Sequence, residues 1–183
     1  MTDHSHSTER QRNIWAPWRM EYIDSLSDED QGCFLCRYRD DPANDAENLV
    51  LWRGRRSFVV LNRFPYTGGH SLIAPAEHVG DVADLDDETL LEMMHLLRDL
   101  KRTLDEALSP DGYNVGINIG QCAGAGLPGH LHVHVVPRWG GDTNFMPVFG
   151  GVRVIPQTLG ELYTQLREAS GKLGLPKLPQ DES

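Results

Sequence analysis

The stretch HLHVHVV, residues 130–136, places three histidines at alternate positions with aliphatic residues between them. Successive side chains of a β-strand point to opposite faces, so this alternation predicts a strand. His130, His132 and His134 would share one face of that strand, and the aliphatic residues would fill a core on the other. Burying three imidazoles requires three sets of partners. The histidine face must therefore meet a metal, an anion or water.

The spacing of residues along a strand limits how many of the three histidines can bind the same ion. Neighbouring positions on one face lie roughly 6.6 Å apart, and the first and third lie roughly 13 Å apart. Two adjacent imidazoles can reach one metal ion, whereas three on a straight strand are too widely spaced. At least one of the three histidines therefore needs a different function.

Composition restricts the class of protein. The chain has 183 residues, of which 39% are hydrophobic and 24% are charged, as in an ordinary globular domain. A net charge of −10 argues against a broad nucleic-acid surface. No apolar run approaches the roughly 18–20 residues of a membrane helix, and the polar N-terminus lacks a secretory signal. We expect a cytoplasmic protein that binds neither nucleic acid nor membrane.

Local patterns predict an α+β fold with a largely antiparallel sheet of about five strands and a long crossover helix. The helix begins at Asp86, which can cap it, and ends at the Pro-Gly turn after Leu108. The other expected strands are 48–53, 57–62, 70–75 and 113–120, and a terminal helix is expected at 157–174.

One domain is expected between two tails. Residues 1–13 are polar and resemble a disordered tail, and residues 174–183 form a second tail. The catalytic domain would span 14–173. Its first segment, IWAPWRMEYI at 14–23, is too apolar for a free tail and should dock on the body.

Cys33 and Cys36 form a Cys-x-x-Cys pair, which inside a cell indicates a metal site or a redox site rather than a disulfide scaffold. Structural zinc prefers four ligands, and Cys2His2 is a common set. His78 and His130 are candidates for the missing pair. A free dithiol and a thioredoxin-like redox pair stay open as alternatives.

If His130 binds metal, His132 and His134 remain beside the glycine-rich loop AGAGLPG, residues 123–129. A neutral imidazole is a good nucleophile near pH 7, and backbone N–H groups of such a loop can hold phosphate oxygens. The combination suggests nucleotidyl or phosphoryl transfer through a phosphohistidine-type intermediate. The chain has no GxxxxGK[ST] motif and no carboxylate cluster suited to magnesium.

Several of these motifs match one family. HLHVHVV fits the His-φ-His-φ-His-φ-φ signature of the histidine triad proteins, and NRFPYTGGHSLIAPAEH at 62–78 resembles their upstream segment. CFLC at 33–36 resembles the zinc knuckle of the bacterial branches and of galactose-1-phosphate uridylyltransferases. The segments at 14–23 and 137–147 look like the branch of diadenosine tetraphosphate phosphorylases and hydrolases.

The resemblance implies a role for each matching residue. His132 would attack the α-phosphate, His134 would contact that phosphate, and His70 would belong to a supporting hydrogen-bond network. A structural zinc ion would be bound by Cys33, Cys36, His78 and His130. The nucleotide would be bound by Asn62, Asn118, Gln121, Gly124, Gly126 and Trp139. The resemblance also implies a homodimer.

The implied activity is cleavage of a dinucleoside polyphosphate, such as diadenosine tetraphosphate, through a nucleotidyl-histidine, with phosphate or water as acceptor. Many members carry Gln and Ser or Thr four and three residues before the triad, where this chain has Gly126 and Leu127. The difference affects which leaving group and acceptor we expect, but not which residue is the nucleophile.

Two alternative functions stay open. One is a zinc hydrolase with a catalytic metal, and the other is a nucleotide-binding module with vestigial chemistry.

Overall fold

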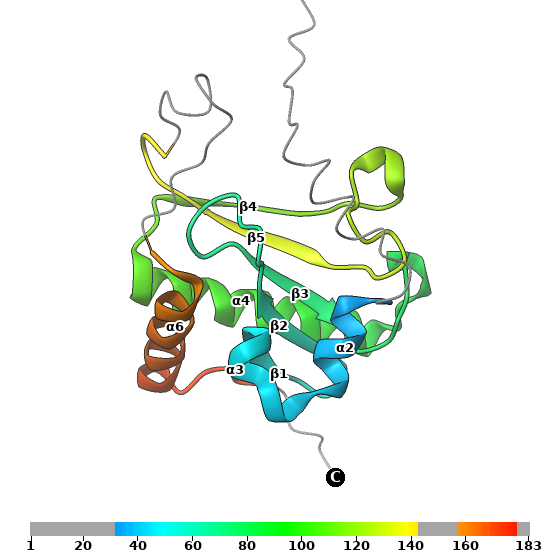
Figure 1. The fold of residues 1–183 in the computed structure, drawn as a ribbon, viewed down its shortest axis with the longest axis horizontal. Coiled ribbons are helices and arrows are strands. Elements are labelled where there is room, and N and C mark those ends of the chain that lie inside the picture. The colour runs from blue at the N-terminus through cyan, green and yellow to red at the C-terminus, as the bar shows by residue number, and fades with distance from the viewer. Residues whose placement is uncertain (1–31, 143–156, 179–183) are drawn as a thin grey trace, which may run out of the picture.

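A computed structural model describes residues 32–142 and 157–178 of the chain. Its centre is an antiparallel sheet in the order β1-β2-β3-β5-β4 (Figure 1). The strands are β1 (Val50–Arg53), β2 (Ser57–Leu61), β3 (Ser71–Pro75), β4 (Gly112–Ile117) and β5 (Val133–Arg138). The expected α+β fold is confirmed. The tail at 1–13, the docking of 14–23 and the last five residues lie outside the described parts.

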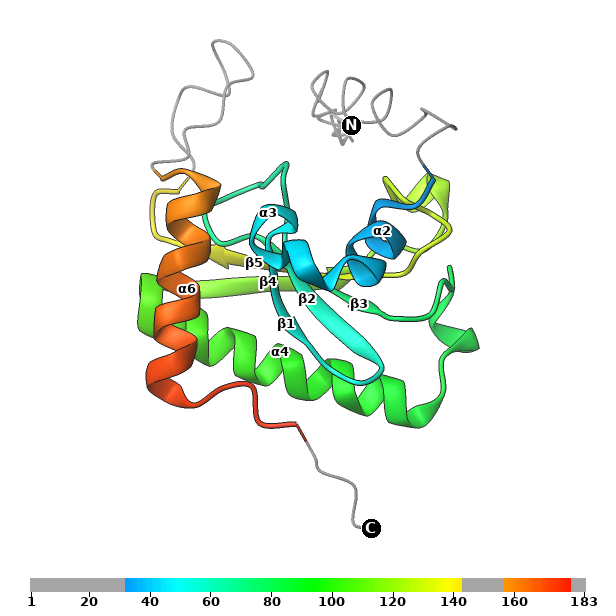
Figure 2. The ribbon, with the colours of Figure 1, turned by 60° about the horizontal axis from the view of Figure 1, so that its bottom comes forward.

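The helices lie on both sides of the sheet. They are α2 (Phe34–Asp40), α3 (Asp45–Asn48), α4 (Asp87–Leu108) and α6 (Leu159–Leu173), with short 3-10 turns η2 (Pro42–Asn44), η3 (Val82–Asp84) and η4 (Gln121–Ala123). Helix α4 is the crossover between β3 and β4 and covers one face, while α2 and α3 lie on the opposite side (Figure 2). Within the described residues no helix is long and apolar enough to cross a membrane.

Helix α4 begins where the sequence predicts. The Asp86 carboxylate accepts a hydrogen bond from the Thr89 N–H at 2.7 Å, an N-cap that contributes about 1 kcal/mol. Leu96, Leu100 and Leu104 are fully buried against the sheet. Each such side chain contributes roughly 1.5–3 kcal/mol, so this apolar stripe, rather than helix propensity, holds α4 on the sheet.

A buried carboxylate of α4 fixes the turn between β1 and β2. Glu92 accepts hydrogen bonds from Ser57 Oγ at 2.7 Å, Arg56 N at 2.9 Å and Arg55 N at 3.3 Å. These donors compensate for the cost of burying the charge. A Cβ atom at Gly54 would overlap Glu92 Oε1, so any side chain at this position would displace the carboxylate.

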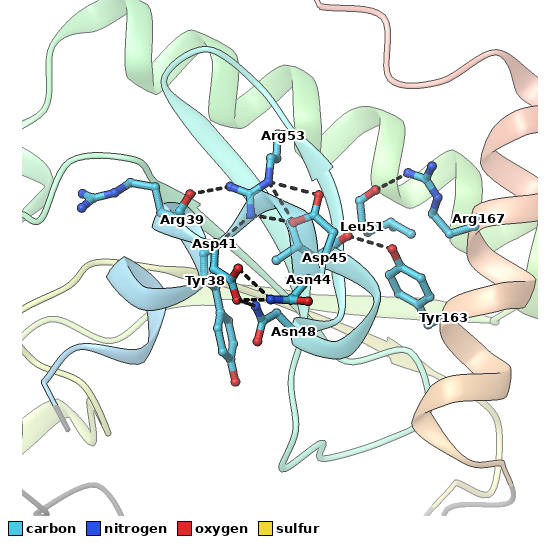
Figure 3. Close-up of polar contacts among 11 residues, drawn as sticks. Tyr38, Arg39, Asp41, Asn44, Asp45, Asn48, Leu51, Arg53, Tyr163 and Arg167 are labelled. Atoms are coloured by element: carbon cyan, nitrogen blue, oxygen red, sulfur yellow. Dashed lines mark hydrogen bonds and ion pairs between the residues drawn. The ribbon is translucent and has the colours of Figure 1, made fainter.

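Helix α6 and the segment after it cover the outer edge of the sheet at β1. Tyr163 Oη donates to the Val50 carbonyl at 3.1 Å, and Arg167 Nη1 donates to the Leu51 carbonyl at 2.8 Å (Figure 3). Trp52 Nε1 donates to Ser170 Oγ at 2.9 Å. The edge carbonyls of β1 are thereby paired with side chains and closed to another strand.

Helices α2 and α3 were not expected from the sequence, because both are short and their positions depend on contacts distant in sequence. The Arg53 guanidinium of β1 binds the Asp45 carboxylate of α3. It also donates to the carbonyls of Tyr38 at 2.5 Å and Arg39 at 2.8 Å, in the last turn of α2 (Figure 3). One arginine thus caps α2 and joins both helices to the sheet.

We expect Gly54→Ala to destabilise the protein by about 1–3 kcal/mol, because displacing Glu92 breaks buried charge-assisted hydrogen bonds. Gly171→Ala is the matched control, since a Cβ there meets no atom of the described residues within 4 Å and alanine favours a helix. Urea denaturation of both variants measures the difference. Equal stability of the two variants would contradict the role of Glu92.

Candidate active site and metal centre

The histidine-rich segment enters the sheet later than the alternation suggests. Strand β5 begins at Val133, so the expectation that His130 and His132 belong to the strand is wrong. The Leu131 N–H donates to the Val79 carbonyl at 2.6 Å, which ties this approach to the loop after β3. His130 consequently turns toward the cysteines, while His132 and His134 lie together, with ring centroids 4.8 Å apart.

Four potential metal ligands converge at the start of α2. Cys33, Cys36, His78 and His130 each offer one ligand atom, and these atoms lie within 4.8 Å of one another. The Sγ–Nδ1 distances are 3.2 Å for Cys33–His130, 3.3 Å for Cys36–His78 and 3.5 Å for Cys36–His130. Zinc bond lengths imply a separation of about 3.6 Å between S and N ligands in a tetrahedron. The cluster therefore fits zinc.

The tautomer of His130 suits metal binding. The Pro75 carbonyl accepts a hydrogen bond from His130 Nε2 at 2.9 Å, which leaves the Nδ1 lone pair directed at the cysteines. Burial lowers the pKa of His130 to about 4, so the ring is neutral. Burial raises the pKa of Cys33 to about 11. A bound cation would replace the proton of this thiol.

The backbone of His130 also orients His132. A carbonyl oxygen only accepts, so the 2.8 Å contact between His132 Nδ1 and His130 O places the proton of His132 on Nδ1. The lone pair of the neutral ring is then on Nε2. His132 is buried, and burial lowers its pKa, which favours this neutral form. His132 is therefore prepared to act as a nucleophile.

The hydrogen bonds of His70 indicate the opposite tautomer for His134, with the proton on Nε2. The Tyr66 N–H can only donate, and it lies 3.1 Å from His70 Nδ1. The proton of neutral His70 is then on Nε2, 3.0 Å from His134 Nδ1, so His134 accepts there and has its own proton on Nε2. A ring nitrogen with a lone pair, on His132, and a ring N–H, on His134, thus occur on neighbouring histidines.

Tyr66 was missed by the sequence analysis. Its ring stacks on His70 with centroids 4.6 Å apart, and it lies 6.1 Å from the ring of His134. Asn62, at the start of the same loop, accepts from the Phe64 N–H at 2.9 Å and places Nδ2 3.3 Å from His70 Nδ1. The signal in the sequence was the position of Tyr66, an aromatic residue in the loop between Asn62 and His70.

The other expected nucleotide-binding residues occupy two places. Asn118 Nδ2 contacts the Gly124 carbonyl at 3.5 Å, which joins the end of β4 to the glycine-rich loop. Gln121 is exposed in η4, which leads into that loop. Gly126 lies within the loop. Trp139 comes just after β5, at the opposite end of the strand from His132, and its N–H donates to the Asp142 carboxylate at 3.3 Å.

The tautomers can be measured by long-range ¹H–¹⁵N NMR of the imidazoles near neutral pH. We expect the proton on Nδ1 of His132 and on Nε2 of His70 and His134. The expectation follows from a carbonyl that only accepts and an N–H that only donates. A proton on Nε2 of His132 or on Nδ1 of His134 would contradict the assignment.

Metal analysis should find about one zinc ion per chain. Cys36→Ser should lose the ion and lower the Tm by roughly 5 °C or more, because metal binding contributes to folding. Cys122→Ser is the control, since Cys122 is an exposed free thiol outside the cluster. A metal-free wild type, or zinc loss in both variants, would refute the site.

Comparisons with known proteins agree with this geometry. The family model described as the HIT domain matches residues 43–141. The AP-4-A phosphorylase of Mycobacterium tuberculosis is 39% identical over 153 residues, which cover 81% of this chain and 78% of that protein. The asymmetrical bis(5'-nucleosyl)-tetraphosphatase of Schizosaccharomyces pombe is 32% identical over 89 residues, 49% of this chain and 48% of that protein.

A solved structure connects the fold with the metal. The Zn-bound histidine triad family protein from Mycobacterium smegmatis superimposes with a TM-score of 0.63 at 30% identity, covering 78% of this chain and 96% of that one. The matched domain model, this structural likeness and the paired histidines lead to one assignment. The chain belongs to the HIT domain family, the histidine triad proteins.

Proposed function

We propose that this chain is a nucleotidyl-transferring enzyme that cleaves dinucleoside polyphosphates, such as diadenosine tetraphosphate, at the α-phosphate. The observation that carries the proposal is the pair of neighbouring histidines with opposite tautomers, His132 with a lone pair on Nε2 and His134 with a proton there. Relatives named AP-4-A phosphorylase and bis(5'-nucleosyl)-tetraphosphatase support the substrate class.

In the first step, His132 Nε2 attacks the α-phosphorus and a nitrogen–phosphorus bond forms. The bond from that phosphorus to its bridging oxygen breaks, and the oxygen leaves with the electron pair as part of ATP. His134 donates a hydrogen bond to a non-bridging oxygen. Covalent catalysis of this kind replaces one difficult displacement by two easier ones.

In the second step, phosphate or water attacks the nucleotidyl-histidine and restores neutral His132. Phosphate yields ADP and water yields AMP. Backbone N–H groups of the glycine-rich loop would stabilise the phosphoryl oxygens. The positive φ of Gly120 permits the turn that leads toward this loop, and that of Gly124 permits a turn within it. The M. tuberculosis relative, 39% identical, supports phosphate as the acceptor.

Zinc would be structural in this proposal. Cys33, Cys36, His78 and His130 would supply four protein ligands, the full number of a structural zinc site, and would leave no position for water. Within the described residues, this cluster is the only group of three or more His, Cys, Asp or Glu side chains whose ligand atoms converge, and it includes neither His132 nor His134. This arrangement disfavours the rival zinc hydrolase, in which the triad would hold a catalytic metal.

A product assay tests the reaction. The protein is incubated with diadenosine tetraphosphate, with and without inorganic phosphate, and the nucleotides are separated. We expect ATP and ADP only when phosphate is present, because phosphate then captures the nucleotidyl group. ATP and AMP without phosphate would instead identify water as the acceptor. No product in either reaction would contradict the proposed function.

We expect His132→Ala to lower turnover by at least about 10⁴-fold, because no other described group offers a lone pair at that position. His95→Ala is the matched control, since His95 lies on α4, on the other side of the sheet. Turnover of both variants and their binding of AMP separate chemistry from affinity. Near-wild-type turnover of His132→Ala would disprove the nucleophile.

We also propose a homodimer formed through β4. This edge of the sheet exposes apolar side chains, with exposed fractions of 49% for Val115, 39% for Ile117 and 40% for Ile119. Helix α6 pairs the carbonyls of the opposite edge, so β4 is the edge available to a second copy.

Val115→Asp should convert the dimer to a monomer, because a carboxylate would then be buried in the interface. Analytical ultracentrifugation of the variant and the wild type over a range of concentrations measures the change. A monomeric wild type, or a dimer that persists in the variant, would exclude this interface.

A further inference from the structure

The sheet register gives His134 two very different neighbours. His134 is the partner of Leu72 on β3 and of Gly116 on β4. Directly opposite residues of antiparallel strands direct their side chains to the same face. On the face that holds His134, the β3 side therefore presents a leucine and the β4 side presents no side chain.

The β3 side of His134 is closed. Leu72 is buried with 3% exposure. The ring of Tyr66 lies 6.1 Å from that of His134 and stacks on His70, which itself bonds His134. A substrate phosphate on His134 therefore has protein on this side.

Among residues 32–142 and 157–178, no side chain covers the β4 side of His134. Gly116 is exposed, and a Cβ placed there meets no atom of the described residues within 4 Å. Two residues along on the same face, Asn114 binds Arg138 Nη1 at 2.7 Å, and Arg138 also pairs with Asp142. On this face the exposed Gly116 thus lies between His134 and the polar group of Asn114, Arg138 and Asp142.

We propose that the leaving half of the substrate, the polyphosphate beyond the α-phosphorus, lies over Gly116 and that the missing side chain admits it. In-line displacement places the leaving oxygen on the side of phosphorus away from His132 Nε2. Strand β3, Leu72 and Tyr66 close the other side of His134. The polyphosphate therefore fits on the β4 side. This inference rests on the proposed function and identifies Gly116 as a residue that determines leaving-group size.

The test compares two donors of the same adenylyl group. Diadenosine tetraphosphate releases ATP, whereas adenosine 5′-phosphorofluoridate releases only fluoride when its phosphorus–fluorine bond breaks. The ratio of kcat/KM for the two donors is measured in the wild type, Gly116→Val and Gly112→Val. Gly112 is the matched control, because it lies on the same strand and face, opposite Arg138, with the same free space at Cβ.

We expect Gly116→Val to lower this ratio by about tenfold or more, the range for added methyl groups in a fitted site, and Gly112→Val to leave it near the wild-type value. A ratio cancels any loss of folded or assembled protein. Should Gly116→Val fail to fold, Gly116→Ala adds one methyl into the same open space and should shift the ratio in the same direction.

Two results would overturn the inference. One is an unchanged ratio in both Gly116 variants, and the other is an equal fall in Gly112→Val. Each leaves the proposed function standing, because the wild type still turns over both donors. A wild type that turns over neither donor would instead overturn the proposed function itself.

Discussion

The site depends on His130, which makes contacts through both its imidazole ring and its backbone carbonyl. Its Nε2 donates to the Pro75 carbonyl, its Nδ1 faces two cysteines, and its own carbonyl accepts a hydrogen bond from His132 Nδ1. One residue therefore joins β3, the metal cluster and the candidate nucleophile. Any displacement of His130 would shift the carbonyl that sets the tautomer of His132. An ion bound by His130 would therefore help to orient His132, the candidate nucleophile, without contacting the substrate.

Contacts around the cluster hold α2 and the end of β3 in place. Arg53 holds the last turn of α2, so both cysteines at the start of that helix keep their position relative to the sheet. Arg39 Nη1 adds a bond to the Ala76 carbonyl at 2.7 Å, beside Pro75. The metal cluster is therefore preorganised by protein contacts on both sides, which lowers the ordering cost of binding an ion.

The repeating features of the fold and the four residues of the metal cluster could be predicted from the sequence. Period-2 and period-3.6 patterns predicted the strands and α4, because each element buries one face against a common core. The sequence could not reveal α2, the clamp by Arg53 or the stacking of Tyr66, since these depend on residues far apart in the chain. The start of β5 at Val133 could not be predicted for the same reason, because the hydrogen bond from the Leu131 N–H to the Val79 carbonyl joins residues far apart in the chain. Gly116 looked like an ordinary strand residue until the register placed it opposite His134.

A nucleotidyl group on His132 would be the intermediate of the proposed reaction, and it can be trapped. The protein is mixed with diadenosine tetraphosphate in the absence of phosphate, denatured within milliseconds at alkaline pH, where a phosphorus–nitrogen bond survives, and digested for mass spectrometry. We predict one adenylyl group on the peptide that contains residues 130–136, with fragmentation placing it on His132. Turnover without any adduct at early times, together with immediate loss of activity on chelation in protein that stays folded, would contradict this intermediate and favour a catalytic metal.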